Sequence, residues 1–195
     1  MLHLARLTCF AAAPSAAPCG LAARCYAARA LPAAARRSAD AATEEDMEAL
    51  GAALFAAAPP APSLVAIRGD LGTGKSCFTR GAVRALVGDP ALRVTSPSYL
   101  LDNTYALADG SVVHHMDLHR LAGMGDVEEL GLAAALGADV CLVEWPERLG
   151  DALPAARLDV AISLASDRQT RNVALEGHGE WWAGVLEVVF PLPGS

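Results

Sequence analysis

Apolar and polar positions alternate in blocks whose lengths distinguish strands from helices. SLVAIR at 63–68 and DVCLVEW at 139–145 are short apolar runs of the length that buried strands have. Residues 75–87 instead show helical spacing, and GDP at 88–90 ends that pattern. Strands that alternate with helices predict an α/β domain in which crossover helices connect parallel strands.

Two pairs of alternating segments predict β-hairpins. Residues 98–107 and 111–118 alternate around ADG, and residues 158–164 and 172–176 alternate around SDRQ. Because hairpins pair strands antiparallel, the predicted sheet is mixed. We therefore expect one α/β domain over residues 40–195, with three layers and a mixed, mostly parallel sheet.

Helices are also predicted on both sides of these strands. One begins with Thr43 as its cap, carries acids in its first turn and runs to about Ala58, where two prolines end it. DVEELGLAAAL at 126–136 predicts a second helix with Asp126 as its cap. A final amphipathic segment contains Trp181 and Trp182. This tryptophan pair is interpreted as core and surface of a terminal helix.

The stretch GDLGTGKS contains Lys75, the only lysine of the chain. Its fixed positions match the phosphate-loop pattern G-x4-G-K-[ST], with an apolar strand before it and a helix after it. Glycines allow the backbone to expose N–H groups to phosphate oxygens, and Lys75 supplies a point charge that an arginine fork does not replace. The Ser76 hydroxyl is expected to bind Mg²⁺. The predicted nucleotide-binding residues of the P-loop NTPase fold are Gly69, Asp70, Leu71, Gly72, Thr73, Gly74, Lys75, Ser76 and Cys77.

Two predicted strands end in a carboxylate. VVHHMD ends at Asp117, and CLVE ends at Glu144. Ligands of such sheets lie at the carboxyl ends of the strands, so either acid is a candidate for holding Mg²⁺ or positioning water. The alternative for each is a solvated acid or the cap of a following helix. Trp145 either lines the nucleotide or packs.

Three histidines surround Asp117, but they do not predict a zinc site. His114 and His115 are adjacent on a strand and therefore face opposite sides, while His119 lies beyond it. No cysteine–histidine cluster accompanies them. We expect one packed and two exposed histidines. Nor does CxxC spacing or a disulfide framework occur.

Charge divides the chain near residue 40. Residues 1–39 contain five arginines and no acid, whereas the remaining ten cations face all 22 acids, a net of −12. The basic, alanine-rich beginning predicts a disordered organellar transit peptide; a cytosolic tail and a secretory signal are the alternatives. The acidic remainder argues against stable direct binding to nucleic acid. No apolar run has the length of a membrane span.

Several classes of nucleotide-binding protein remain at this point. A Ras-type GTPase needs an N-K-x-D segment, and no second lysine exists to form one. A small-molecule kinase normally has an arginine-bearing lid, which is not visible. A module that binds ATP without cleaving it stays open.

An ordered set of motifs resembles the TsaE family, small ATPases of bacterial-type tRNA threonylcarbamoyladenosine synthesis. The set is GDLGTGKS-CFTRG, SPSY, HMDLHRL, EELGL, LVEWPERL and LP, and the resemblance covers residues 44–164. It implies binding of ATP and Mg²⁺ and association with TsaD-like and TsaB-like proteins. That complex transfers threonylcarbamoyl to tRNA, so tRNA is reached only through the partners. ATP hydrolysis is expected to reset the complex between turnovers.

The resemblance also assigns roles to residues. Glu144, Asp117 and Ser98 are implied as catalytic: the acid of the VEWP segment, a Mg²⁺- or water-coordinating acid and a switch hydroxyl. Ser76, Asp117 and Glu144 would contact the metal, and Trp145 the nucleotide.

The chain departs from the family pattern at a few positions. Serine replaces the usual threonine at 76 and 98, and Met116 and His119 replace aromatic residues. Met47 stands where a threonine is frequent. All charged and hydroxyl groups needed for hydrolysis remain, which predicts an active ATPase that is slow by itself. A bacterial-type pathway with an organellar presequence favours the plastid stroma over the mitochondrial matrix.

Overall fold

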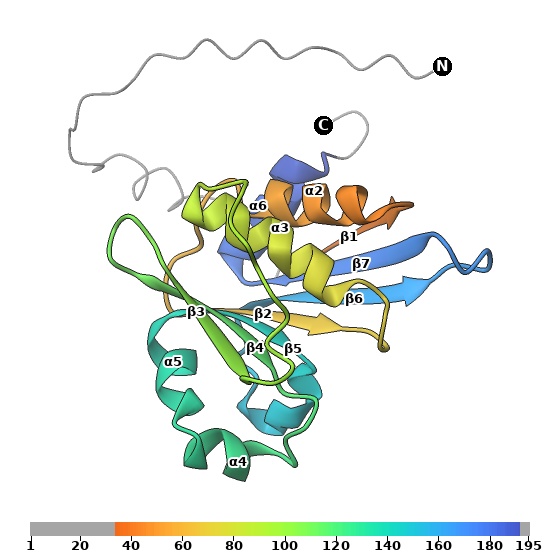
Figure 1. The fold of residues 1–195 in the computed structure, drawn as a ribbon. Coiled ribbons are helices and arrows are strands. Elements are labelled where there is room, and N and C mark those ends of the chain that lie inside the picture. Colours follow the sequence, from red (N-terminus) through yellow and green to blue (C-terminus); the bar gives the residue numbers. More distant parts are fainter. Residues whose placement is uncertain (1–33, 192–195) are drawn as a thin grey trace, which may run out of the picture. The chain divides into compact units, whose positions relative to one another are not determined.

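The computed structural model describes residues 34–191, which form a seven-stranded sheet with helices packed on it (Figure 1). The strand order is β1-β7-β6-β2-β5-β4-β3. The strands are β1 (Ala34–Ala41), β2 (Ser63–Arg68), β3 (Asp102–Ala106), β4 (Val112–Asp117), β5 (Val140–Glu144), β6 (Arg157–Leu164) and β7 (Arg171–His178). The helices are α2 (Glu44–Leu54), α3 (Lys75–Val87), α4 (Met124–Glu129), α5 (Leu132–Ala138), the 3₁₀ segment η1 (Pro146–Ala152) and α6 (Glu180–Val189).

The centre of the sheet is parallel and its two sides are antiparallel. β2 pairs in parallel with β5 and β6, and β4 pairs in parallel with β5. The hairpins β3–β4 and β6–β7 extend the sheet on either side, as the alternating segments predict. All five residues of β5 are buried. A continuous apolar run of this kind is what a strand covered on both faces requires.

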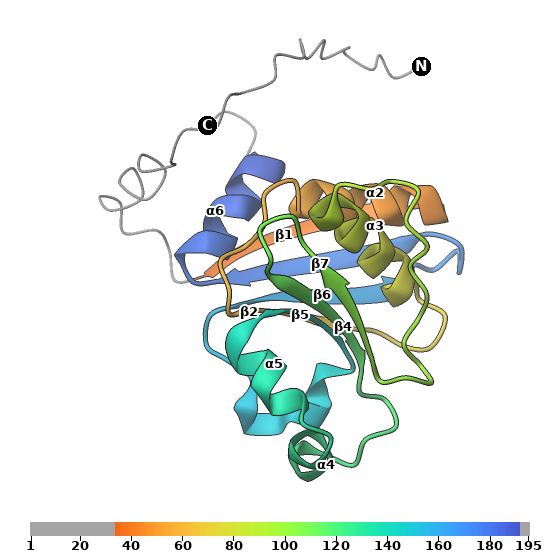
Figure 2. The same ribbon diagram turned by 60° about the vertical axis from the view of Figure 1, so that its left-hand side comes forward.

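Helices cover both faces of the sheet, which confirms the three-layer α/β fold. Figures 1 and 2 show α2, α3 and α6 on one face and α4 and α5 on the other. The first face buries Phe78 and Trp182 against strand residues such as Leu142. The second buries Val127 and Leu149 against residues such as Val143. Between residues 34 and 191, no helix is both long and apolar enough to cross a membrane.

The domain begins earlier than the charge boundary predicts. Residues 34–39, expected to be part of a disordered presequence, belong to β1, which pairs antiparallel with β7 over its whole length. Ala35 and Ala41 are buried, while Arg36 forms an ion pair with Glu176 of β7. Pairing with a distant strand, rather than local sequence preference, therefore decides the structure of this segment. The rest of the predicted transit peptide, residues 1–33, lies outside the described residues.

Two predicted helices have different limits. The first ends at Leu54 instead of Ala58, although Thr43 caps it as expected and forms a capping box with Asp46. The predicted helix 126–136 is two helices, because Gly131 adopts a left-handed φ of 74° and ends the first of them. Asp126 is not the cap of α4, which begins after Gly123. Its carboxylate instead accepts a hydrogen bond from the Ala122 N–H.

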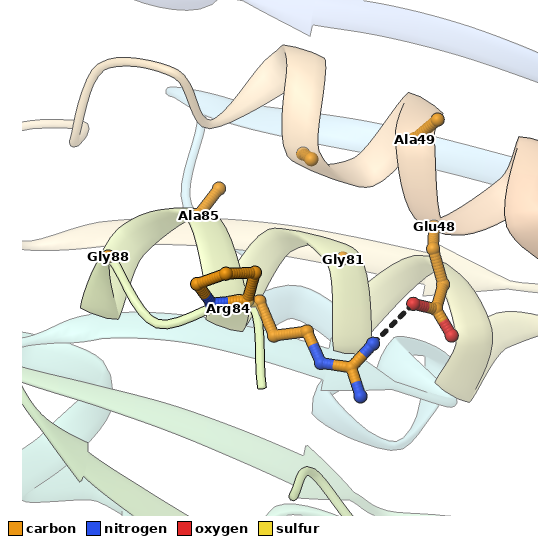
Figure 3. A pocket seen from close by; sticks show the side chains of 8 residues that line it. Glu48, Ala49, Gly81, Arg84, Ala85 and Gly88 are labelled. Carbon is orange, nitrogen blue, oxygen red and sulfur yellow. Dashed lines mark hydrogen bonds and ion pairs between the residues drawn. The ribbon is translucent and has the colours of Figure 1, made fainter. Parts of the chain in front are cut away.

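Helices α2 and α3 approach each other at two glycines. A Cβ added to Gly81 would lie 1.9 Å from the Glu48 carbonyl oxygen, and one added to Gly51 would lie 2.2 Å from the Phe78 carbonyl oxygen. Figure 3 shows Glu48 of α2 facing Arg84 of α3 beside this contact, where the two side chains form an ion pair. Because the atoms in the way are backbone, neither helix can yield by a side-chain rotation.

Gly81→Ala is expected to destabilise the fold by about 1–3 kcal/mol, because the added methyl forces the two helices apart. Gly137→Ala in α5 is the matched control, since no atom lies within 4 Å of its added Cβ. That change should be neutral or stabilise by up to about 1 kcal/mol through reduced chain entropy. Urea unfolding followed by circular dichroism measures both. Equal effects of the two substitutions would contradict the close crossing of α2 and α3.

Asp159 of β6 accepts hydrogen bonds from Arg68, Arg157 and His178. Burial by itself would raise the pKa of Asp159, but the hydrogen bonds from Arg157 and Arg68 outweigh it and lower the pKa below its usual 3.8. A carboxyl whose pKa is lowered by folding stabilises the native state above its unfolded pKa, and this contribution disappears as the pH falls through the folded pKa.

Asp159→Asn should therefore cost about 1–3 kcal/mol of unfolding free energy at pH 6, and the difference from wild type should shrink towards pH 3. Urea titrations at a series of pH values measure it. The control is Asp151→Asn, an exposed aspartate for which the described part of the chain shows no ion pair. A deficit of Asp159→Asn that stays constant between pH 6 and pH 3 would exclude this electrostatic role.

Candidate active site

The phosphate-loop segment, residues 69–76, connects the end of β2 to the first turn of α3. Gly69 has a φ of 148°, and a Cβ there would lie 2.5 Å from the Ile162 carbonyl oxygen of β6. Gly74 precedes the helix with a left-handed φ of 104°. Side chains at either position would be strained, so the two glycines of the motif are required by backbone geometry.

Lys75 folds back over its own loop. Its Nζ donates hydrogen bonds to the carbonyl oxygens of Gly69 at 2.7 Å and Asp70 at 2.9 Å. The same nitrogen lies 4.5 Å from the centre of the Trp145 ring, a cation–π contact. Burial lowers the pKa of Lys75, while the carboxylates of Glu144 and Asp117 oppose that shift. The cation is thus held inside the site, with two acids beside it.

The register of β4 and β5 places the two predicted acids side by side. Asp117 pairs with Glu144, and Ile67 at the end of β2 pairs with Glu144 from the other side. Both carboxylates are largely buried, with 7% and 3% of each residue exposed. Neither is therefore a solvated strand end, and neither caps a helix.

Each acid accepts a hydrogen bond from one of the two predicted hydroxyls. Ser76 Oγ donates to Glu144 Oε1 at 2.9 Å, and Ser98 Oγ donates to Asp117 Oδ2 at 2.9 Å. The second oxygen of Asp117 accepts the backbone N–H of His119. The structure therefore brings all four polar side chains together around Lys75.

A cavity of about 280 Å³ lies above these groups. Ten of the predicted site residues line it; Gly69, Asp70 and Thr73 form the inner hydrogen bonds of the loop instead. Three further lining residues, Glu44, Ser96 and Arg171, were not predicted. Ser96 is hydrogen-bonded to Ser98, so proximity in sequence was a usable signal for it. Glu44 and Arg171 come from α2 and β7, and nothing in the local sequence connects them to the loop.

Trp145 and Cys77 both line the cavity. Trp145 has a left-handed φ of 60° at the point where β5 ends, which turns its ring towards Lys75 and within 4.5 Å of the His119 ring centroid. Its side chain therefore forms a wall of the cavity. Burial and the nearby Glu44 carboxylate raise the pKa of the Cys77 thiol, which favours its neutral form.

The three histidines have three different environments. His115 is completely buried and bonded to Glu144, and His119 is exposed. His114, expected to be exposed, is half-buried because its Nδ1 lies 2.7 Å from Asp102 Oδ2 and its Nε2 lies 3.4 Å from Asp139 Oδ2. Within residues 34–191, no group of three or more His, Cys, Asp and Glu side chains is arranged to hold a metal by itself.

The chemistry of the cavity is that of a phosphate and a hard cation. Hydroxyl and carboxylate oxygens converge from Ser76, Asp117 and Glu144. Such oxygens are the donors that Mg²⁺ takes, and this ion usually binds with few protein ligands when a substrate phosphate supplies others. Gly72 has open space around it, so the loop backbone is accessible from the cavity. The residues present thus fit a nucleotide with bound Mg²⁺.

Comparison with known proteins gives a consistent result. The family model "Threonylcarbamoyl adenosine biosynthesis protein TsaE" matches residues 41–173. A TsaE protein of Haemophilus influenzae is 37% identical over 113 residues, covering 57% of this chain and 68% of that protein. One of Streptomyces coelicolor is 36% identical over 128 residues, covering 63% and 85%.

A solved structure agrees with the sequence comparison. The crystal structure of YdiB from Bacillus subtilis superimposes with a TM-score of 0.63 at 27% identity, covering 80% of this chain and 95% of that one. The matched region contains the whole phosphate loop and both strand-end acids. This chain belongs to the TsaE family.

Proposed function

We propose that this protein is a Mg²⁺-dependent ATPase that serves as an accessory subunit in the formation of N6-threonylcarbamoyladenosine in tRNA. The names of its relatives support the pathway. The observation that carries the activity is the paired arrangement of Ser76 with Glu144 and Ser98 with Asp117 around Lys75. A protein that only holds ATP needs the loop and its lysine, whereas hydrolysis also needs acids in this position.

Each residue of the site has a role in that proposal. Lys75 and the loop N–H groups bind the phosphates, and Trp145 contacts the nucleotide. Ser76, Asp117 and Glu144 would hold Mg²⁺, which would supply positive charge against the phosphates. Glu144 would orient the attacking water and accept its proton, since its carboxylate already contacts the Ser76 hydroxyl of the loop.

Ser98 is the proposed switch hydroxyl. Its bond to Asp117 connects the segment between α3 and β3 to the acid pair, so a change at the acids is transmitted to that segment. A change of the bound nucleotide would in this way alter the conformation of a surface segment. In that segment Tyr99 and Leu100 are 90% and 75% exposed.

The proposed partners are TsaD-like and TsaB-like proteins, which carry out the transfer itself. ATP hydrolysis by this subunit would allow the complex to act repeatedly. The chain from residue 40 onward has a net charge of −12, which disfavours direct binding to the phosphates of tRNA. In this proposal the partners bind the tRNA. The arginine-rich beginning of the sequence supports an organellar location, with the plastid stroma favoured over the mitochondrial matrix.

Glu144→Ala and Asp117→Ala should retain at least part of the ATP binding and lose turnover by about 100-fold or more, because both leave the phosphate loop in place. Phosphate release measures turnover, and equilibrium dialysis with labelled ATP measures binding. Asp109→Ala is the matched control, an exposed acid in the β3–β4 turn. Wild-type turnover no higher than that of either site variant would contradict the catalytic role of these acids.

Reconstitution tests the pathway. The full chain, Mg-ATP, tRNA, and TsaD and TsaB of the same organelle are combined, and ATP hydrolysis and threonylcarbamoyl transfer are followed together. We expect the partners to stimulate ATP hydrolysis and transfer to continue beyond one turnover only when this chain is present. If ATP binds but neither activity responds to the partners, the nucleotide-binding fold is still supported, and the proposed function in tRNA modification is wrong. ATP consumption that requires a small-molecule acceptor would indicate a kinase instead.

A further inference from the structure

His115 is a buried polar side chain that the proposed reaction has not yet used. It lies on β4 two residues before Asp117, and none of its surface is exposed. Residues two apart on a strand face the same side, so His115 faces α3 together with Asp117. Its partner strand β5 places Leu142 opposite His115 and Glu144 opposite Asp117. His115 does not line the cavity, and it can influence the chemistry only through a neighbour.

That neighbour is Glu144. The His115 Nε2 atom lies 2.8 Å from Glu144 Oε1, the same oxygen that accepts the Ser76 hydroxyl at 2.9 Å. An ionised carboxylate oxygen only accepts hydrogen bonds, so Nε2 donates here when it carries the ring proton. The structure gives the other oxygen, Oε2, no hydrogen bond within residues 34–191. Two donors thus hold one oxygen of Glu144 and leave the second available to the cavity.

Burying the His115 ring is unfavourable for the stability of the fold. His115 Nδ1 is buried and has no hydrogen-bond partner within the described residues. An apolar side chain of similar size would fill the same space without this desolvation penalty. Among residues 34–191, the hydrogen bond to Glu144 is the only polar interaction of the ring, and it is the feature that a leucine would lack.

We propose that His115 is a positioning residue that fixes the orientation of Glu144 for ATP hydrolysis; this rests on the proposed ATPase activity. With the carboxylate free to rotate, Glu144 spends less time aimed at water and also holds the Ser76 hydroxyl less firmly. Hydrogen-bonding partners of this kind, one layer behind the reacting groups, typically contribute 10- to 100-fold to activity.

The kinetic test compares His115→Leu with His115→Gln, using the full chain and Mg-ATP. Leucine removes the donor, and glutamine keeps an N–H donor at the end of its side chain. We expect His115→Leu to lower kcat about 10- to 100-fold while KM for ATP changes less than about threefold. His115→Gln should recover kcat to within about fivefold of wild type. His114→Gln, the neighbour that faces the opposite side, should leave kcat near wild type.

A second readout needs no nucleotide. Long-range ¹H–¹⁵N spectra of the free protein identify which imidazole nitrogen carries the proton. We expect a protonated Nε2 on His115 whose signals shift in Glu144→Gln and not in Asp109→Ala. A proton on Nδ1 alone, or an unchanged kcat in a folded His115→Leu variant, would overturn the proposal. So would a folded His115→Gln variant as inactive as His115→Leu.

The two proposals can fail separately. If the wild-type protein does not hydrolyse ATP even with its partners, the proposed function is wrong. His115 then has no role in catalysis, whatever the spectra show. Normal wild-type hydrolysis with His115→Leu equally active removes only the positioning role. Melting temperatures of all variants distinguish loss of kcat from loss of folded protein.

Discussion

The register of three parallel strands is the constraint on which the site depends. β2, β5 and β4 lie side by side, and their pairing places Ile67, Glu144 and Asp117 at one level. The phosphate loop begins just beyond Ile67, so the lysine and both acids meet without any long insertion. A slip of one residue would turn each acid to the other face of the sheet. A slip would also break the hydrogen bonds from Ser76 to Glu144 and from Ser98 to Asp117, which hold both acids at this level.

The opposite wall of the site is held by the contact between α2 and α3. Gly51 and Gly81 allow the two helix backbones to touch, which fixes the start of α3 relative to the sheet. Met47 of α2 is buried, and its side chain lies close to Gly74 of the loop. This position of α2 is thus occupied by a packing residue behind the loop. Its contribution is to support the backbone of the phosphate loop from behind.

The parts of the fold predicted from sequence are those encoded locally. Apolar runs gave β2 and β5, helical spacing gave α3 with its limits, and the phosphate loop followed from spacing and context. Asp117 and Glu144 were identified because they end strands. β1 was missed because an alanine–arginine segment has little strand preference of its own and its partner β7 begins 130 residues later.

The same limit applies within the site. Alternation along β4 predicted that His114 and His115 face opposite sides, but not what each meets there. Glu144 lies 29 residues beyond His115, and Asp139 lies 25 beyond His114, so both contacts exist only through the pairing of β4 with β5. The backbone turn at Trp145 is likewise a consequence of where β5 ends. Contacts that depend on the register between strands cannot be predicted from the sequence of a single segment.

The strand β1 also limits how the N-terminus can be processed. A protease that removed the chain up to residue 39 would take most of β1 and leave β7 as the edge of the sheet, with a row of unpaired backbone groups. Exposed edges of this kind promote strand exchange between molecules and aggregation. The same cut would also remove Ala35 and Arg37, which contact the α6 side of the fold. Ala35 belongs to the hydrophobic core there, and Arg37 donates a hydrogen bond to the Phe190 carbonyl at the end of α6. Only a cut before Ala34 would leave β1 whole, several residues upstream of the point where the charge of the sequence changes.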